Sequence, residues 1–359
     1  MNTSAISDLI GSSQYQAVAD DSLKDEDNAA WVMELESRVK EEWIERISWI
    51  RLVDRLAENE LVDSSSSEFR KFYTGWKELL TKGRIGSECT YRDVLISIRD
   101  RWFKDSTNSI HRLSIHSWDR FLEATARYHR SNLVIETLEQ YTTMLEALSG
   151  SCFQVLPTLP EKYWQAAAAF GALDQFFNNL RDMREDAEQG ICYLPAELLS
   201  EFEVSRDEIL NLTACQNPNY TAMMRFWIDG YLPRLRQKTY DLMVAEDLPP
   251  SWEIWRDWSF HRYRRIERVF RGCQFNYSLF PHVYWYEVQR DLPFLLSQVR
   301  QELQSLAHEA AYHPAHSQEE FMIPEALLGI GKKAVNVVES VLNTFHCQNT
   351  RRIQPSEIY

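Results

Sequence analysis

The stretch Ala166–Gln189, AAAAFGALDQFFNNLRDMREDAEQ, decides how this chain folds. Its first part is small, apolar and free of proline, so it predicts a helix that is buried around most of its circumference. Its second part adds Asn178, Asp182 and Asp186 at a spacing of four residues. In one continuous helix these side chains project from the same face as a stripe of oxygen ligands. Like charges at this spacing destabilise a helix unless a cation lies between them.

The rest of the chain has the composition of an all-α protein. Only 11 of 359 residues are glycine, and no proline precedes Pro157. A β-sandwich or barrel needs turn residues about every 8–12 positions, so both are excluded. Besides the stretch above, which we expect to stay helical until Pro195, helical periodicity occurs at 31–63, 67–83, 91–103, 117–128, 131–148, 205–215, 219–245, 251–272, 283–312 and 324–346.

We divide the chain into three parts on composition. Residues 1–28 are polar and acidic, which is typical of a disordered tail. Residues 29–280 form the predicted helical domain, and residues 281–359 form a C-terminal helical extension. A possible cluster of His308, His313 and His316 lies in that extension, but its spacing favours a solvated linker over a metal site.

Charge and cysteine content exclude several classes of function. The chain has 39 basic and 53 acidic residues, a net charge of −14, which argues against nucleic acid as a partner. Six scattered cysteines without a CxxC pair are typical of free thiols in a reducing compartment. Because the first residues do not resemble a signal peptide and no apolar run reaches the length of a membrane span, we predict a cytoplasmic location.

A second acidic pair lies in the segment RLVDRLAE, which begins at Arg51. Asp54 and Glu58 share one helix face at a spacing of four. Taken alone, this pair favours an ordinary solvated face, where Arg51 and Arg55 neutralise it. The stripe at Asn178, Asp182 and Asp186 is more specific because it follows a buried run. Mg²⁺ suits such a stripe, since it prefers carboxylate oxygens and completes its shell with waters and substrate phosphates.

The stretch from Gln175 to Pro195 resembles the second aspartate-rich motif of the squalene/phytoene synthase family, Q-x-x-N-x-x-R-D-x-x-x-D followed by a glycine and Y-L-P. The matching positions are Gln175, Asn178, Arg181, Asp182, Glu185, Asp186, Gly190, Tyr193, Leu194 and Pro195. RLVDRLAE resembles the first motif of that family, R-x-x-D-x-x-x-D, with Glu58 in place of its last aspartate. Gly150 resembles the glycine of a helix break in the family, whereas Tyr128 stands where the family has an acidic residue.

The resemblance implies an isoprenoid-synthase-type helical bundle around a central apolar cavity. It also implies a Mg²⁺-dependent prenyltransferase that condenses two prenyl diphosphates, farnesyl or geranylgeranyl, head-to-head with release of diphosphate. The implied metal ligands are Asp54, Glu58, Asn178, Asp182 and Asp186. Arg51 and Arg181 are candidates for diphosphate contacts, although Arg181 could equally pair with its acidic neighbours, and Tyr193 is a candidate for closing the site.

Two alternatives stay open on the sequence. The change at Tyr128 is compatible with a terpene cyclase or transferase that uses a single prenyl diphosphate in the same fold. A helical scaffold without catalysis is the third hypothesis, and the two acidic motifs argue against it. The sequence contains no signature of an NADPH site, and a hydrophobic product leaves open a peripheral membrane contact for its release. Chain length of the substrate and oligomeric state are not encoded in any motif.

Overall fold

The computed structural model describes residues 35–58, 68–87, 89–105, 107–129 and 133–288. The chain divides into two compact units, one formed by Glu45–Tyr284 and one by Met1–Ile44 with Trp285–Tyr359. The description below concerns the first unit. The predicted tail 1–28, the three histidines of the predicted extension and the helix predicted at 324–346 lie outside the described residues, so the three-part division stays a prediction.

Every regular element within these described ranges is a helix, which confirms the all-α prediction. The helices are α4 (Ser37–Glu58), α5 (Glu68–Lys82), α6 (Arg92–Trp102), α7 (Ser109–Tyr128), α8 (Leu138–Leu145), α9 (Ser151–Gln154), α10 (Trp164–Arg181), α11 (Met183–Glu188), α12 (Ala196–Glu201), α13 (Arg206–Leu210), α14 (Tyr220–Arg225), α15 (Leu232–Lys238), α16 (Tyr240–Met243) and α17 (Pro250–Gly272). Two π-helical turns, Glu146–Gly150 and Phe226–Tyr231, join α8 to α9 and α14 to α15. None of the described helices has the length and apolarity needed to cross a membrane.

Helix boundaries differ from the predicted ones where a polar cap decides them. The helix predicted at 117–128 begins at Ser109, because the Asn108 side-chain oxygen accepts hydrogen bonds from two free amides, Ile110 N at 2.9 Å and His111 N at 3.3 Å. The helix predicted at 131–148 begins at Leu138, where the Thr137 hydroxyl accepts from Gln140 N at 3.1 Å. Both differences follow from a side chain that satisfies the first turn of the helix.

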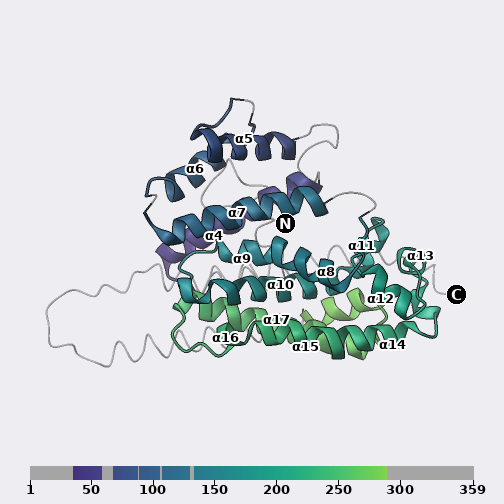
Figure 1. Ribbon diagram of the computed structural model, residues 1–359. Coiled ribbons are helices and arrows are strands. Elements are labelled where there is room, and N and C mark those ends of the chain that lie inside the picture. The colour runs from purple at the N-terminus through teal and green to yellow at the C-terminus, as the bar shows by residue number, and fades with distance from the viewer. Residues whose placement is uncertain (1–34, 59–67, 88, 106, 130–132, 289–359) are drawn as a thin grey trace, which may run out of the picture. The chain divides into compact units, whose positions relative to one another are not determined.

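Helix α10 lies in the middle of the unit. It packs against α8, α9 and the π-helical turn between them, and against α15, α16 and α17 (Figure 1). Most of its residues are buried, including the run from Ala166 to Asp174, as the composition of this stretch predicts. Aromatic contacts join it to α17, where the rings of Phe177 and Tyr263 stack with centroids 4.6 Å apart. Because α10 is central, several neighbouring helices determine the positions of the side chains near its C-terminal end.

Two glycines let α10 approach the π-helical turn closely. A Cβ atom on Gly171 would lie 2.2 Å from the Ser149 carbonyl oxygen and 2.8 Å from the Gly150 Cα atom. A Cβ on Gly150 would lie 2.7 Å from the Ala168 carbonyl oxygen. One helical turn after Gly171, Gln175 accepts a hydrogen bond from the Ser149 hydroxyl at 2.5 Å. These contacts set the rotation of α10 and therefore the direction in which its polar end points.

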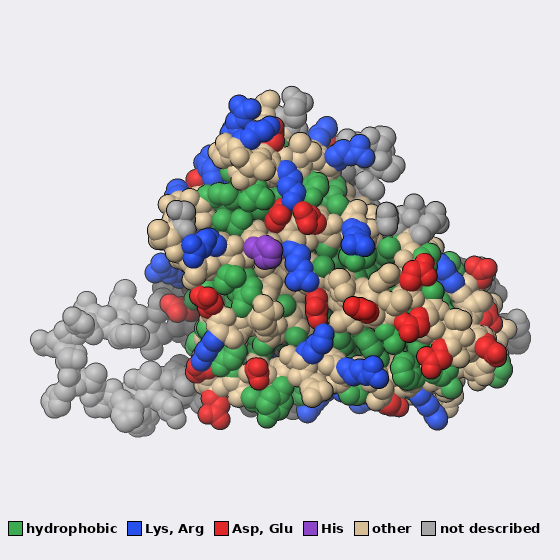
Figure 2. Space-filling model, in the orientation of Figure 1, with side chains coloured by type: hydrophobic (Ala, Val, Ile, Leu, Met, Phe, Trp, Pro, Cys, Tyr) green, Lys and Arg blue, Asp and Glu red, His purple; other side chains and the backbone are tan. Residues whose placement is uncertain are grey.

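Acidic side chains are unevenly distributed on the face shown in Figure 2. They gather over the end of the unit that is formed by α11, α12 and α13 (Figure 2). Exposed carboxylates at this end include Glu185 and Glu188 on α11 and Glu197 on α12. Part of the net negative charge therefore lies at the same end of the unit as Asp182 and Asp186.

The close contact at Gly171 predicts a large effect of one methyl group. We expect Gly171→Ala to lower the free energy of unfolding by about 3 kcal/mol or more, because the backbone of the π-helical turn cannot yield as a flexible side chain does. Gly272→Ala is the matched control, since a Cβ there meets no atom within 4 Å and helix propensity favours alanine by up to about 1 kcal/mol. Urea denaturation measures both variants, and equal effects would contradict the assignment.

Candidate active site

The predicted stripe of oxygen ligands lies where α10 passes into α11. The prediction of one continuous helix up to Pro195 is wrong at two places. Asp182 separates α10 from α11 with φ −94° and ψ 5°. Helix α11 then ends at Glu188, and Gly190 follows with φ 77°, a conformation that ends helices. Helical hydrogen bonds nevertheless cross the break at Asp182, from Asp182 N to Asn178 O at 2.9 Å and from Asp186 N to Asp182 O at 2.8 Å. Asn178, Asp182 and Asp186 therefore keep their spacing although the helix changes direction between them.

Asn178 contributes a buried oxygen that is not used within the protein. Its Nδ2 atom donates a hydrogen bond to Asp174 Oδ2 at 3.0 Å. Its Oδ1 atom is buried and has no hydrogen-bond partner among the residues that the structure describes. Leaving a buried acceptor unsatisfied costs about 1–3 kcal/mol, so such an atom is suited to bind a ligand. An amide oxygen is a suitable ligand for a hard cation.

The two aspartates of the stripe have different surroundings. Arg181 donates from Nε and Nη2 to the two oxygens of Asp182, both at 2.8 Å, which is the strong bidentate arrangement. Burial raises the pKa of Asp186 well above its usual range, and the charges of Asp182 and Glu185 raise it further, with Arg181 opposing them. A carboxyl group with these neighbours becomes easier to ionise when a cation binds beside it.

The first motif is less completely described. On α4, Arg51 Nη1 donates to Asp54 Oδ2 at 3.2 Å, and both side chains are half-buried. Glu58 is the last residue of α4, and its side chain lies outside the described part of the chain. The Cys152 thiol on α9 has a pKa raised well above its usual range by burial and then by the charges of Asp54 and Asp174. Asp54 therefore lies within electrostatic reach of the helix that packs against α10.

Two further residues near these motifs have no signal in the sequence. The pKa of His129 is lowered by burial, and the charge of Asp54 opposes that effect, so this histidine is within electrostatic reach of the first motif. Asp174 is buried and accepts hydrogen bonds from Arg262 and from Tyr263 at 2.7 Å. Neither could be found from motif spacing, because Arg262 and Tyr263 lie 88 and 89 residues from Asp174 in the chain, and Asp54 is similarly far from His129.

The oxygen donors fit a divalent cation of the Mg²⁺ type by their chemistry. A set of amide and carboxylate oxygens is what Mg²⁺ prefers, and the unpartnered Asn178 Oδ1 is the observation that favours a bound ion. The side chains are not gathered into a finished site: among the described residues, no three His, Cys, Asp or Glu side chains are close enough to hold a metal together. The five-residue ligand set predicted from the sequence therefore stays a prediction.

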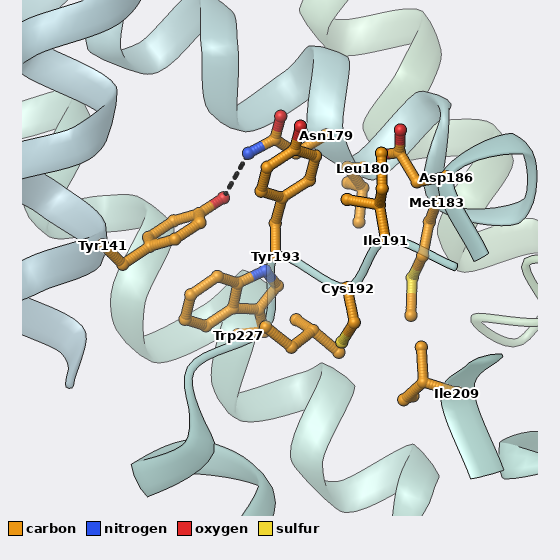
Figure 3. A pocket seen from close by; sticks show the side chains of 11 residues that line it. Tyr141, Asn179, Leu180, Met183, Asp186, Ile191, Cys192, Tyr193, Ile209 and Trp227 are labelled. Atoms are coloured by element: carbon orange, nitrogen blue, oxygen red, sulfur yellow. Dashed lines mark hydrogen bonds between the residues drawn. The ribbon is translucent and has the colours of Figure 1, made fainter. Parts of the chain in front are cut away.

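A pocket opens beside the stripe and contains Tyr193 (Figure 3). Its wall includes Asp186 and Met183 from α11, Tyr141 from α8 and Trp227 from a π-helical turn. Tyr193 comes from the loop that follows α11. Arg206 holds this loop in place by donating a hydrogen bond to the Cys192 carbonyl oxygen at 3.0 Å.

The polar part of that pocket is fixed by amides of α10. Asn179 Nδ2 donates to the Tyr141 hydroxyl at 3.1 Å (Figure 3). Gln175 Nε2 in turn donates to Asn179 Oδ1 at 2.8 Å. The same motif thus supplies the stripe of ligands, which begins at Asn178, and the next residue, Asn179, which lines the pocket that contains Tyr193. The structure brings Tyr193 and Asp186 to one pocket, and a role of Tyr193 in closing the site stays a prediction.

A family model described as Squalene/phytoene synthase matches residues 48–237 of the chain. A 15-cis-phytoene synthase of Synechococcus elongatus is 33% identical over 125 residues, which are 34% of this chain and 38% of that protein. A 15-cis-phytoene synthase of Synechocystis sp. is 38% identical over 115 residues, 31% of this chain and 32% of that protein. The alignments thus span about a third of the length of these curated relatives.

Solved structures support the fold. A dehydrosqualene synthase in complex with ligand superposes with a TM-score of 0.56 at 14% identity, covering 78% of this chain and 98% of that one. The squalene synthase HpnC from Alicyclobacillus acidocaldarius superposes with a TM-score of 0.55 at 14% identity, covering 76% and 98%. At this identity the likeness concerns the fold alone, and it confirms the predicted helical bundle class.

The raised pKa of Asp186 predicts a pH-dependent gain in stability for Asp186→Asn. In the unfolded chain this carboxyl ionises near its ordinary pKa of about 3.9, whereas the folded protein resists ionisation. The wild type therefore loses stability as pH rises from about 4 to the raised pKa of Asp186. The variant has no carboxyl group at this position, so its stability does not fall for this reason. Without divalent metal, we expect the variant to be more stable than the wild type at about pH 8 and nearly equal at about pH 4.

Urea denaturation at both pH values measures this difference. Glu188→Gln is the control, because Glu188 is an exposed carboxylate on the same helix and pairs with Arg184 at 2.9 Å. The control should show no comparable gain at high pH. An equal stability difference for Asp186→Asn at both pH values would contradict the electrostatic account of this residue.

Proposed function

Because the chain belongs to the squalene/phytoene synthase family, we propose that it is a Mg²⁺-dependent prenyltransferase that condenses two prenyl diphosphates head-to-head and releases diphosphate. Farnesyl and geranylgeranyl diphosphate are the candidate substrates. The names of the two cyanobacterial relatives, 15-cis-phytoene synthases, support the coupling of two substrates over the use of one.

One observation carries this proposal more than any other. Asn178, at the asparagine position of the second motif, keeps its Oδ1 atom buried and without a partner among the described residues. Asp182 and Asp186 follow at the motif spacing, and helical hydrogen bonds maintain that spacing across the break in the helix. A scaffold without a ligand gains nothing from an unsatisfied oxygen beside two repelling carboxylates.

A bound divalent metal supplies neutralising charge to the diphosphate as it leaves. In this chain Asn178 Oδ1, Asp182 and Asp186 would hold it from α10 and α11, and Asp54 and Glu58 from α4. Arg181 holds the Asp182 carboxylate at two points, and Arg51 holds that of Asp54 at 3.2 Å. These ion pairs favour a positioning role for both arginines, and a direct contact with diphosphate remains part of the proposal for them.

The chain also has to protect a reactive allylic cation from water. The interior next to the stripe is built from aromatic rings, among them Phe177 and Tyr263 in a stack and Phe170 against Phe153. Such rings offer a negative face to a cation. The phenylalanines contain no nucleophile that would trap it, and the Tyr263 hydroxyl is bound to Asp174 at 2.7 Å. Tyr193, in the pocket next to Asp186, is proposed to close the polar end of this interior.

The location of this chemistry in the cell follows from the same proposal. A reaction that begins with charged diphosphates and ends with a hydrocarbon needs access to water at one end of the site and a route to lipid at the other. We propose a cytoplasmic enzyme, with peripheral membrane contact as the route for product release.

Asp182→Asn is the variant that tests the proposed activity. With farnesyl or geranylgeranyl diphosphate and Mg²⁺, we expect the wild type to release diphosphate and to form a C30 or C40 hydrocarbon. The variant should lose diphosphate release by on the order of 100-fold or more, because the charge that develops on the leaving group is no longer neutralised. Chelation of Mg²⁺ should have the same effect on the wild type.

Glu188→Gln is the matched control for activity, because it removes an exposed charge from the same short helix. It should retain the wild-type rate. Diphosphate release without a C30 or C40 product would replace the coupling reaction by the use of a single prenyl diphosphate. No release from either substrate, with Asp182→Asn unchanged from the wild type, would leave a binding scaffold as the function.

A further inference from the structure

A buried ion pair lies directly behind the proposed site and is not part of either acidic motif. Asp174 on α10 and Arg262 on α17 are joined across 88 residues of sequence, with side chains only 8% and 2% exposed. Burying two charges costs several kcal/mol per ion before their attraction is counted. Since two apolar residues of similar volume would pack at least as well, stability alone does not account for this pair.

Asp174 collects three hydrogen bonds in a defined arrangement. Its Oδ1 atom accepts from Arg262 Nη2 and from the Tyr263 hydroxyl, the latter at 2.7 Å. Its Oδ2 atom accepts from Asn178 Nδ2 at 3.0 Å. Both oxygens of Asp174 are thus engaged. Oδ2 is bound by Asn178, the side chain that we expect to bind metal.

The chemistry of these groups fixes the orientation of the Asn178 amide. An ionised carboxylate only accepts hydrogen bonds, so the amide must turn its NH₂ group toward Asp174. Its oxygen then points the other way, and that atom is the buried Oδ1 without a partner among the described residues. A neutral amide at position 174 could donate to Asn178, and the amide of Asn178 would then be free to turn its oxygen inward.

We propose that Asp174, held by Arg262 and Tyr263, is a positioning residue that aims the Asn178 oxygen at the metal of the proposed site. This inference rests on the proposed function, because it assigns a purpose to the orientation of one ligand. Residues that orient a metal ligand from behind affect metal affinity by about 10–100-fold in other proteins. Arg262, Tyr263 and Asn178 all donate to this carboxylate, so the geometry assigns it the role of acceptor toward Asn178.

The test measures the binding of Mn²⁺, as a probe for Mg²⁺, to the full chain in the presence of inorganic diphosphate. Electron paramagnetic resonance reports free and bound Mn²⁺ without any reaction. We expect Asp174→Asn to weaken Mn²⁺ binding by about 10–100-fold, because the new amide at position 174 lets Asn178 turn its NH₂ group toward the metal. The variant has nearly the same volume as the wild type.

A double variant separates orientation from stability. Asp174→Asn with Asn178→Asp exchanges the two side chains, so that the carboxylate at position 178 accepts from the amide at position 174 and still presents an oxygen to the metal. We expect most of the Mn²⁺ affinity to return. A residue that merely stabilised the fold would give no such recovery, since the double variant changes the buried network at two places instead of one.

Asp119→Asn is the matched control for the single variant. Asp119 also accepts from a tryptophan and a cation, Trp76 Nε1 at 2.8 Å and Lys77 Nζ at 2.6 Å, but it belongs to neither motif. Its variant should bind Mn²⁺ as the wild type does.

If Asp174→Asn does not fold, Tyr263→Phe replaces it, with Tyr220→Phe as control, since each removes one buried hydroxyl donor. Weaker Mn²⁺ binding in Tyr263→Phe alone supports the proposal, and equal binding in both overturns it.

Asn178→Ala distinguishes this inference from the proposed function. If Asn178→Ala weakens Mn²⁺ binding and Asp174→Asn does not, the positioning role is overturned and the metal site stands. If the wild type binds no Mn²⁺ with diphosphate, or if Asn178→Ala binds it unchanged, the role of Asn178 fails and the inference is overturned together with that part of the proposed function.

Discussion

The contact between α10 and the π-helical turn at Gly150 and Gly171 is the constraint on which the site depends. With a Cβ on Gly171, an atom would stand 2.2 Å from a backbone oxygen, so the two backbones meet at a distance that only glycine permits. This contact sets the rotation of α10, and with it the direction of Gln175 one turn later and of Asn178 after that. The ligand stripe is thus aimed by backbone packing more than ten ångströms of helix away from Asp182.

Charge is handled differently on the two sides of that helix end. On the inner side, Asp174 forms an ion pair with Arg262 and accepts a hydrogen bond from Tyr263, and its other oxygen orients Asn178. On the outer side, burial and two neighbouring carboxylates raise the pKa of Asp186. The protein therefore satisfies one buried carboxylate completely and leaves another with excess repulsion. A site that is completed by a cation requires such an imbalance, because full satisfaction by protein groups would leave no affinity for the ion.

Several elements could be predicted from local sequence, and the failures have identifiable causes. The helix predicted at 251–272 agrees with α17 to one residue, because Pro250 occupies the first helical turn, where its missing amide hydrogen is harmless. The predicted helix at 219–245 is instead divided into α14, a π-helical turn, α15 and α16. That division includes Gly230 and Pro233, but nothing in their spacing specifies a π-helical turn rather than a bend. The start of α7 at Ser109 could have been predicted from its cap, Asn108, whereas the break at Asp182 could not.

The sequence by itself determined the helical class, the buried character of α10 and the spacing of Asn178, Asp182 and Asp186, since propensity and periodicity are properties of neighbouring residues. It also determined the family, through side chains in register over one short stretch. Only the tertiary structure decided which way the Asn178 amide faces and which carboxyl group resists ionisation. Both depend on burial and on partners such as Arg262, which is 88 residues from Asp174 in the chain and is brought beside it by the packing of α17 on α10.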